Sequence, residues 1–151
     1  MKLDRWISRP ASHAGAQLVR PETLLLPSRP QAPTEARDFV REHLGTTAPD
    51  VTAGHLDDVV LIVSELVTNA VRHATTMDTA DDSLCLVIDT DGRRTRVEVH
   101  DPARHHPHMR SATTQDDYGR GLAIIDALCP GAWGVSDTPD GKAVWAVVKA
   151  S

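Results

Sequence analysis

A polar stripe on one otherwise apolar helix constrains this chain more than any other feature. Glu65, Asn69 and His73 follow one another at intervals of four residues in a segment rich in Val, Leu and Ala. At about 3.6 residues per turn, their side chains climb one face of a single helix. A glutamate can take a proton from a hydroxyl, and an asparagine oxygen can bind a hard cation such as Mg²⁺. The spacing indicates a polar site anchored on a core, although a partly exposed polar face would show it too.

The composition is that of an ordinary single domain. The 151 residues carry a formal net charge of −5, which disfavours direct nucleic-acid binding because such binding neutralises phosphates. Cys85 and Cys129 have no redox or metal-ligand spacing, so we expect two reduced thiols. No apolar run approaches the about 20 residues of a membrane span, and the N-terminus lacks the apolar segment of a signal peptide. We therefore expect a cytoplasmic protein that does not enter a membrane.

The hydrophobic pattern predicts one domain over residues 21–151, preceded by a flexible N-terminal tail over residues 1–20. Turn sequences between the predicted strands indicate two hairpins. The predicted order is β-α-α-β-β-α-β-β. This order suits an α+β two-layer sandwich, with a mostly antiparallel mixed sheet covered on one face by about three helices. The predicted strands are 22–26, 83–89, 95–101, 132–136 and 142–148, and the predicted helices lie around 36–44, 56–74 and 121–128.

The boundaries of the first two helices are expected from proline, glycine and charge. Pro30 and Pro33 favour the start of the first helix, and Gly45 is a natural C-terminal stop. Gly54 interrupts the chain before the second helix. The acidic residues 57–58 would then lie in the first turn of that helix, where the helix dipole favours negative charge.

A long polar loop leads into a glycine-rich helix start. Residues 102–118 show neither a helical nor a strand period, and a loop of this length is more often a functional lid than filler. Gly119 and Gly121 follow, where backbone N–H groups can approach an anion without obstruction by a Cβ atom. Asp101 ends the preceding strand, where its carboxylate could accept a hydrogen bond from an exocyclic amine such as that of adenine. A structural helix cap and a turn-forming Asp-Pro explain these features at least as well when each is taken alone.

Taken together, these motifs resemble those of the GHKL ATPase superfamily, which includes gyrase, heat-shock chaperones, histidine kinases and mismatch-repair proteins. The chain most resembles a small stand-alone branch, the anti-sigma-factor serine kinases and related actinobacterial ATP-binding regulators. The resemblance covers roughly residues 22–149 and implies the ATP-binding sandwich of this superfamily, the Bergerat fold. Its motifs are Glu-Leu-x-x-Asn-Ala-x-x-His-Ala at 65–74, Val-Glu-Val-His-Asp at 97–101, Gly-Arg-Gly-Leu at 119–122 and Gly-Lys-Ala-Val-Trp at 141–145.

The resemblance implies roles for residues of this chain. Asn69 would coordinate Mg²⁺ at the ATP phosphates, and Glu65 would be the general base that activates the hydroxyl of a protein serine. Asp101 would accept a hydrogen bond from the adenine amine. His73 would contact phosphate or pack against the helices, and neither alternative is favoured. The remaining implied cofactor contacts are Gly119, Arg120 and Gly121 at the phosphates and the position of Ala143 near the base.

The second motif departs from the pattern of the superfamily. That motif is usually Asp-x-Gly-x-Gly, whereas residues 101–105 read Asp-Pro-Ala-Arg-His. Ala103 and His105 replace glycines that let the backbone turn beside the base, and Pro102 precedes them. Ala143 stands where a threonine hydroxyl often supports the aspartate or the adenine. A looser or differently shaped adenine side is therefore expected.

Two functions of different class follow from the resemblance. The first is a Mg·ATP-dependent serine/threonine protein kinase that phosphorylates an anti-anti-sigma partner of the STAS type and sequesters a sigma factor. A homodimer is compatible with this function and with the alternative. The alternative is a degenerate nucleotide-binding switch or interaction module that holds a partner without phosphoryl transfer. ATP chemistry requires that Glu65 and Asn69 face the same cavity as the Gly119–Gly121 segment, close enough to share a triphosphate.

Clustered histidines raise a metal-binding alternative. His100, His105, His106 and His108 lie close together in the sequence, and imidazole binds Zn²⁺, Ni²⁺ or Cu²⁺. Their spacing matches no closed structural site. Solvated loop histidines are therefore the preferred interpretation.

Overall fold

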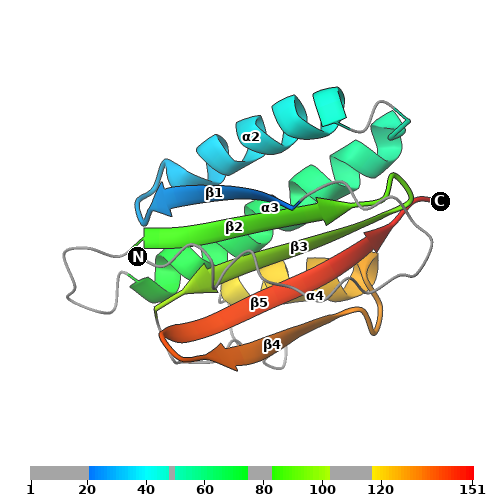
Figure 1. The fold of residues 1–151 in the computed structure, drawn as a ribbon. Helices are drawn as coiled ribbons and strands as arrows, with labels where there is room; N and C mark the ends of the chain where they lie inside the picture. The colour runs from blue at the N-terminus through cyan, green and yellow to red at the C-terminus, as the bar shows by residue number, and fades with distance from the viewer. Residues whose placement is uncertain (1–20, 48–49, 75–82, 103–116) are drawn as a thin grey trace.

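The computed structural model describes residues 21–47, 50–74, 83–102 and 117–151 (Figure 1). The predictions for the tail at 1–20 and for loop residues 103–116 lie outside this part of the chain. Within it, the elements follow one another in the predicted order. They are β1 (Glu22–Pro27), α2 (Ala32–Thr47), α3 (Ala53–Ala74), β2 (Ser83–Thr90), β3 (Arg94–Asp101), α4 (Asp117–Leu128), β4 (Trp133–Thr138) and β5 (Gly141–Lys149).

The described strands form one five-stranded sheet in the order β1-β2-β3-β5-β4. The predicted α+β fold with a mostly antiparallel sheet is confirmed, and every neighbouring pair is antiparallel where a mixed sheet was expected. The reason is the place of β5, which inserts between β3 and β4. The hairpin that joins β4 to β5 therefore brings β5 back antiparallel to β3 as well.

The hairpin between β2 and β3 shows how local sequence sets a strand connection. Gly92 has a φ of 90°, a conformation that residues with a Cβ atom rarely adopt. The Asp91 carboxylate accepts hydrogen bonds from the backbone N–H groups of Arg93, at 2.8 Å, and Arg94, at 2.7 Å. A hairpin between these two strands was predicted from the sequence, and the structure confirms it.

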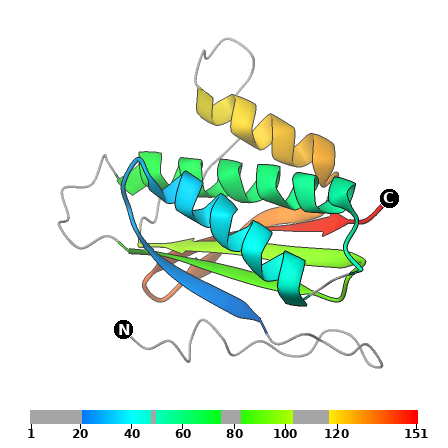
Figure 2. The same ribbon diagram turned by 90° about the horizontal axis from the view of Figure 1, so that it is seen from above.

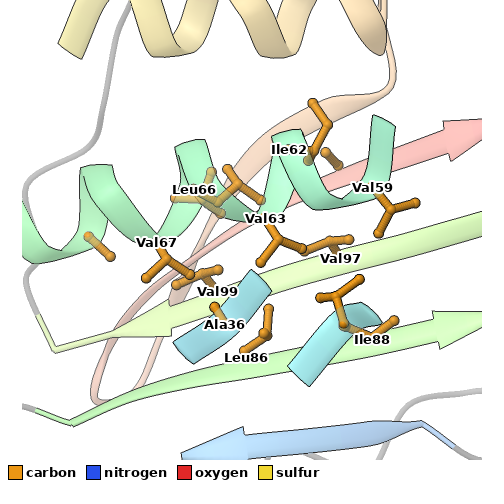
Figure 3. Close-up of a cluster of buried hydrophobic side chains, with 14 of the residues drawn as sticks. Ala36, Val59, Ile62, Val63, Leu66, Val67, Leu86, Ile88, Val97 and Val99 are labelled. Carbon is orange, nitrogen blue, oxygen red and sulfur yellow. The ribbon is translucent and has the colours of Figure 1, made fainter. Parts of the chain in front are cut away.

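The three described helices cover one face of the sheet (Figure 2). α3 lies over the middle of the sheet, with α2 and α4 packed along its two sides. Figure 3 shows the core between α3 and the sheet, where Val63 and Val67 of α3 meet Val97 and Val99 of β3. No helix in the described ranges is long and apolar enough to cross a membrane.

The predicted boundaries of α2 and α3 were wrong by a few residues, for identifiable reasons. Gly45 lacks the positive φ of a C-terminal cap, so α2 continues past it to Thr47. α3 begins at Ala53, before Gly54, because Thr52 caps it: the Thr52 hydroxyl accepts a hydrogen bond from the backbone N–H of His55 at 3.1 Å. The acidic residues 57–58 consequently lie beyond the first turn.

Candidate functional site

α3 holds the predicted polar stripe in a fixed orientation. Asn69, the single asparagine of the chain, is only 5% exposed, and Glu65 is half-buried. Leu66, Val67 and Ala70, the residues interleaved with the stripe, belong to the hydrophobic core. Because the helix cannot turn without exposing these apolar side chains, the core fixes the direction in which Glu65 and Asn69 point.

Gly121 of α4 lies directly against this stripe. A Cβ atom placed on Gly121 would lie 2.8 Å from Glu65 Oε2 and 3.3 Å from Asn69 Oδ1. The stripe and Gly121 are therefore in direct contact, whereas the predicted cavity for a triphosphate stays a prediction. α4 begins at Asp117, however, so Gly119 and Gly121 lie inside the helix and not before it. Gly121 is needed for the close approach of two helices, not for a turn.

Burial tunes the carboxyl group of Glu65. Partial removal from water raises its pKa above the usual range, and the nearby positive charge of Arg72 opposes this shift. A carboxylate with a raised pKa binds a transferred proton more strongly than an exposed one does. Glu65 therefore has the electrostatic environment of a general base.

A buried ion pair holds Asp101, the residue predicted to bind the adenine amine. Asp101, the last residue of β3, stands opposite Lys142 of β5 in the antiparallel register. Lys142 Nζ donates a hydrogen bond to Asp101 Oδ1 at 3.1 Å, and the two side chains are 0% and 1% exposed, respectively. With so little exposure, the Asp101 carboxylate can meet a ligand only after neighbouring atoms move aside.

Gly141 brings β5 close against the end of β3. A Cβ atom on Gly141 would lie 2.0 Å from the backbone oxygen of Asp101 and 2.6 Å from the Cα atom of Pro102. Since both of these are backbone atoms, they cannot yield as a flexible side chain would. Only glycine allows the Asp101–Lys142 register at this point.

The ends of the elements that carry these residues can be compared in the two ribbon views. Figures 1 and 2 both place the last turns of α3, the end of β3 and the start of β5 at the left-hand side, and the first turn of α4 is the end of that helix nearer to this side. The packing of α4 on α3 thus brings together two of the sequence motifs, namely the one that contains Glu65 and Asn69 and the one that contains Gly121. Asp101 ends β3, one of the strands that α3 covers.

Some predicted site residues are not brought together with the others. Ala143 pairs with His100 on the adjacent strand, so strand alternation directs its side chain to the face opposite Asp101 and Lys142. His73 lies in the last turn of α3, and Gly119 and Arg120 lie in the first turn of α4. The side chains of His73 and Arg120 are outside the described part of the chain.

Sequence reasoning missed Lys142. The signal was available, because residues 142, 144, 146 and 148 alternate toward the core with Val144, Ala146 and Val148. A lysine in the inward register of a strand requires a buried partner of opposite charge. Asp101 supplies that charge.

The metal-binding alternative for the histidines gains no support from the described residues. Within them, no group of three His, Cys, Asp or Glu side chains is arranged to hold a metal ion. His100 instead lies beside Glu98, with Nε2 3.1 Å from Glu98 Oε2, on the sheet face away from the helices. His105, His106 and His108 lie outside the described residues.

Comparison with known proteins identifies the fold. Among solved structures, the RsbU and RsbW domains of Rv1364c from Mycobacterium tuberculosis match with a TM-score of 0.63 and 20% sequence identity. The match covers 87% of this chain and 32% of that chain, so this protein spans about a third of the length of the chain that it resembles. A comparison with curated proteins gave no match.

The family follows from the sequence profile. The histidine kinase-like ATPase domain matches residues 26–148, which includes every motif of the site described above. The five-stranded antiparallel sheet with helices on one face agrees with this assignment. This chain therefore belongs to the histidine kinase-like ATPase domain family.

Proposed function

We propose that this protein binds Mg·ATP between α3 and α4 and acts as an anti-sigma-factor serine/threonine kinase. The observation that carries the proposal is the contact of Gly121 with both Glu65 and Asn69. It joins a candidate base, a candidate cation ligand and the start of a helix at one place. Membership in the ATPase family supports ATP as the ligand.

The residues present fit a magnesium-bound triphosphate. The Asn69 side-chain oxygen is a hard donor of the kind that Mg²⁺ prefers, and the positive end of α4 lies close by. The absence of a Cβ atom on Gly121 lets the backbone of α4 approach that oxygen closely. Bound Mg²⁺ would neutralise charge on the phosphates, and Asp101 would accept a hydrogen bond from the adenine amine.

Glu65 would supply the base of the transfer step. The attacking serine or threonine hydroxyl gives its proton to the Glu65 carboxylate as its oxygen bonds to the γ-phosphorus. The bond from that phosphorus to the bridging oxygen breaks at the same time, and ADP leaves. The raised pKa of Glu65 favours acceptance of this proton.

The proposed protein substrate is an anti-anti-sigma partner of the STAS type. The proposed second partner is a sigma factor, and the proposed location of the protein is the cytoplasm. Two observations support this choice: the motif pattern resembles that of the anti-sigma serine kinases, and the fold matches a chain that contains an RsbW domain. The degenerate nucleotide-binding switch is the second candidate, because the Asp101 side chain is withdrawn from solvent and bound to Lys142.

Transfer of label tests the proposal. The protein is incubated with γ-³²P-labelled ATP, Mg²⁺ and the candidate STAS partner, in parallel with Glu65→Gln and with Glu42→Gln, which changes an exposed glutamate of α2. The kinase proposal expects labelled partner with the wild type and with Glu42→Gln, and a loss of at least about a hundredfold with Glu65→Gln. ATP binding without transfer would support the switch, and no ATP binding would refute both.

The metal role of Asn69 has its own test. Calorimetric titration of ATP is compared with and without Mg²⁺ for the wild type, Asn69→Ala and Thr68→Ala, a half-buried neighbour on α3. We expect Mg²⁺ to strengthen ATP binding by the wild type and by Thr68→Ala, but not by Asn69→Ala. Equal affinity and equal Mg²⁺ dependence in all three proteins would contradict the assignment.

A further inference from the structure

Lys142 is an unusual residue to find inside a domain of this size. It is the largest of the fully buried side chains in the described residues, ahead of Ile62 and Leu66. Lysine is almost never fully buried unless its charge is paired. A buried ion pair, moreover, often stabilises a fold no better than apolar side chains of similar volume would. Stability alone therefore does not explain why this position holds a lysine.

The backbone fixes the pair tightly. Asp101 and Lys142 are directly opposite each other on β3 and β5. Gly141, the preceding residue, leaves no space for even a Cβ atom against the Asp101 backbone. This register places the Lys142 ammonium 3.1 Å from Asp101 Oδ1.

The chemistry of the carboxyl group depends on this ammonium. An ionised aspartate only accepts hydrogen bonds, whereas a protonated one carries an O–H donor. Burial favours the protonated form, and a nearby positive charge favours the ionised form. An ionised carboxylate has about four acceptor positions, so it can accept the Lys142 hydrogen bond together with hydrogen bonds from other donors.

We propose that Lys142 is a positioning residue for nucleobase recognition: its ammonium keeps Asp101 ionised and oriented as the acceptor for the exocyclic amine of adenine. The inference rests on the proposed ATP-binding function. Lys142 does not touch the nucleotide in this role. It determines whether the site distinguishes a 6-amino purine from one without the amine.

The test compares ATP with purine riboside triphosphate, which carries hydrogen in place of the 6-amino group. Affinities for both Mg²⁺-bound nucleotides are measured by calorimetry for the wild type and for Lys142→Met, which keeps the length of the side chain and removes its charge. We expect the wild type to prefer ATP by tenfold or more, as for a hydrogen bond to a charged group. Lys142→Met is expected to bind the two nucleotides within about threefold of each other.

Lys149→Met is the matched control, because it makes the same change at an exposed lysine of the same strand. It should keep the wild-type preference. Lys142→Arg, which retains the charge, should also keep a preference for ATP. If Lys142→Met does not fold, the comparison uses Lys142→Gln, which keeps a donor without the charge, and the same loss of preference is expected.

The outcomes separate this inference from the function on which it rests. A wild type that binds ATP and the analogue equally would overturn the base-recognition role and leave ATP binding in place. A Lys142→Met protein that is less stable but keeps the full preference for ATP would show that Lys142 is only structural. Failure of the wild type to bind either nucleotide would overturn the proposed function and this inference together.

Discussion

Replacement of Gly121 by alanine separates the stability of the helices from the function of the site. Alanine in a helix interior is about 0.5–1 kcal/mol more favourable than glycine. The added Cβ atom would lie 2.8 Å from Glu65 Oε2, which is the flexible end of a long side chain and can move at little cost. We therefore expect the free energy of unfolding of Gly121→Ala to lie within about 1 kcal/mol of the wild type.

Function should change far more than stability. The Glu65 carboxylate must move by about half an ångström or more to relieve its contact with the added Cβ atom. The same Cβ atom would lie 3.3 Å from Asn69 Oδ1 and 3.4 Å from Asn69 Nδ2, so it also presses on the Asn69 amide. Misplacement of a catalytic group by about 1 Å can reduce a rate by a hundredfold. We expect phosphoryl transfer by Gly121→Ala to fall by about one to two orders of magnitude, measured as initial rates of label transfer beside urea unfolding curves.

Gly45→Ala provides the control for this prediction. Gly45 lies in α2, and a Cβ atom there would have no neighbour within 4 Å. The same substitution should therefore stabilise the helix slightly and leave transfer unchanged. Full activity in Gly121→Ala, or an equal loss in Gly45→Ala, would refute the reasoning that places the reacting groups against Gly121.

Three further predictions concern stability and reactivity. Gly141→Ala should lower the free energy of unfolding by at least about 2 kcal/mol in urea titrations, because its Cβ atom would meet the Asp101 backbone oxygen. Burial lowers the pKa of His55 below 6.5, so the unfolded state binds the proton more readily than the folded state does. The free energy of unfolding should therefore fall as the pH drops below about 6.5, and His55→Asn should remove this trend. Burial raises the pKa of the Cys85 thiol to about 12 and that of Cys129 to about 11, so neither should react with Ellman's reagent at pH 8 until denaturant is added.

Each of these predictions has a result that would contradict it. Wild-type stability in Gly141→Ala would mean that β3 and β5 are not held as closely as described. An unfolding free energy that stays constant from pH 7.5 to pH 5.5 would exclude a role for His55 in the pH dependence. Rapid release of the chromophore from the native protein would show that Cys85 or Cys129 is accessible.

Local sequence predicted most of the elements and one face of the site. The helical spacing of Glu65 and Asn69 within an apolar segment was sufficient to place both on the same side of α3. The Asp91-Gly92 turn likewise determined a hairpin through its own side chain and φ angle. In both cases the interactions that decide the structure lie within a few residues along the chain.

Interactions between distant segments account for what was missed. Lys142 reaches Asp101 across 41 positions of sequence, and their meeting depends on the register of two strands that are not consecutive. The same register turns Ala143 to the opposite face of the sheet. Gly121 was expected at the start of a helix, and its contact with α3 was missed because the close approach of α4 to α3 has no local signature.

A crystal structure of the protein with Mg²⁺ and a non-hydrolysable ATP analogue tests the central claim most directly. The account predicts the metal-bound triphosphate beside Asn69 and the first turn of α4, with the adenine amine at the Asp101 carboxylate. Density for the nucleotide at any other surface of the protein would contradict it, as would an empty site at a saturating concentration of the analogue.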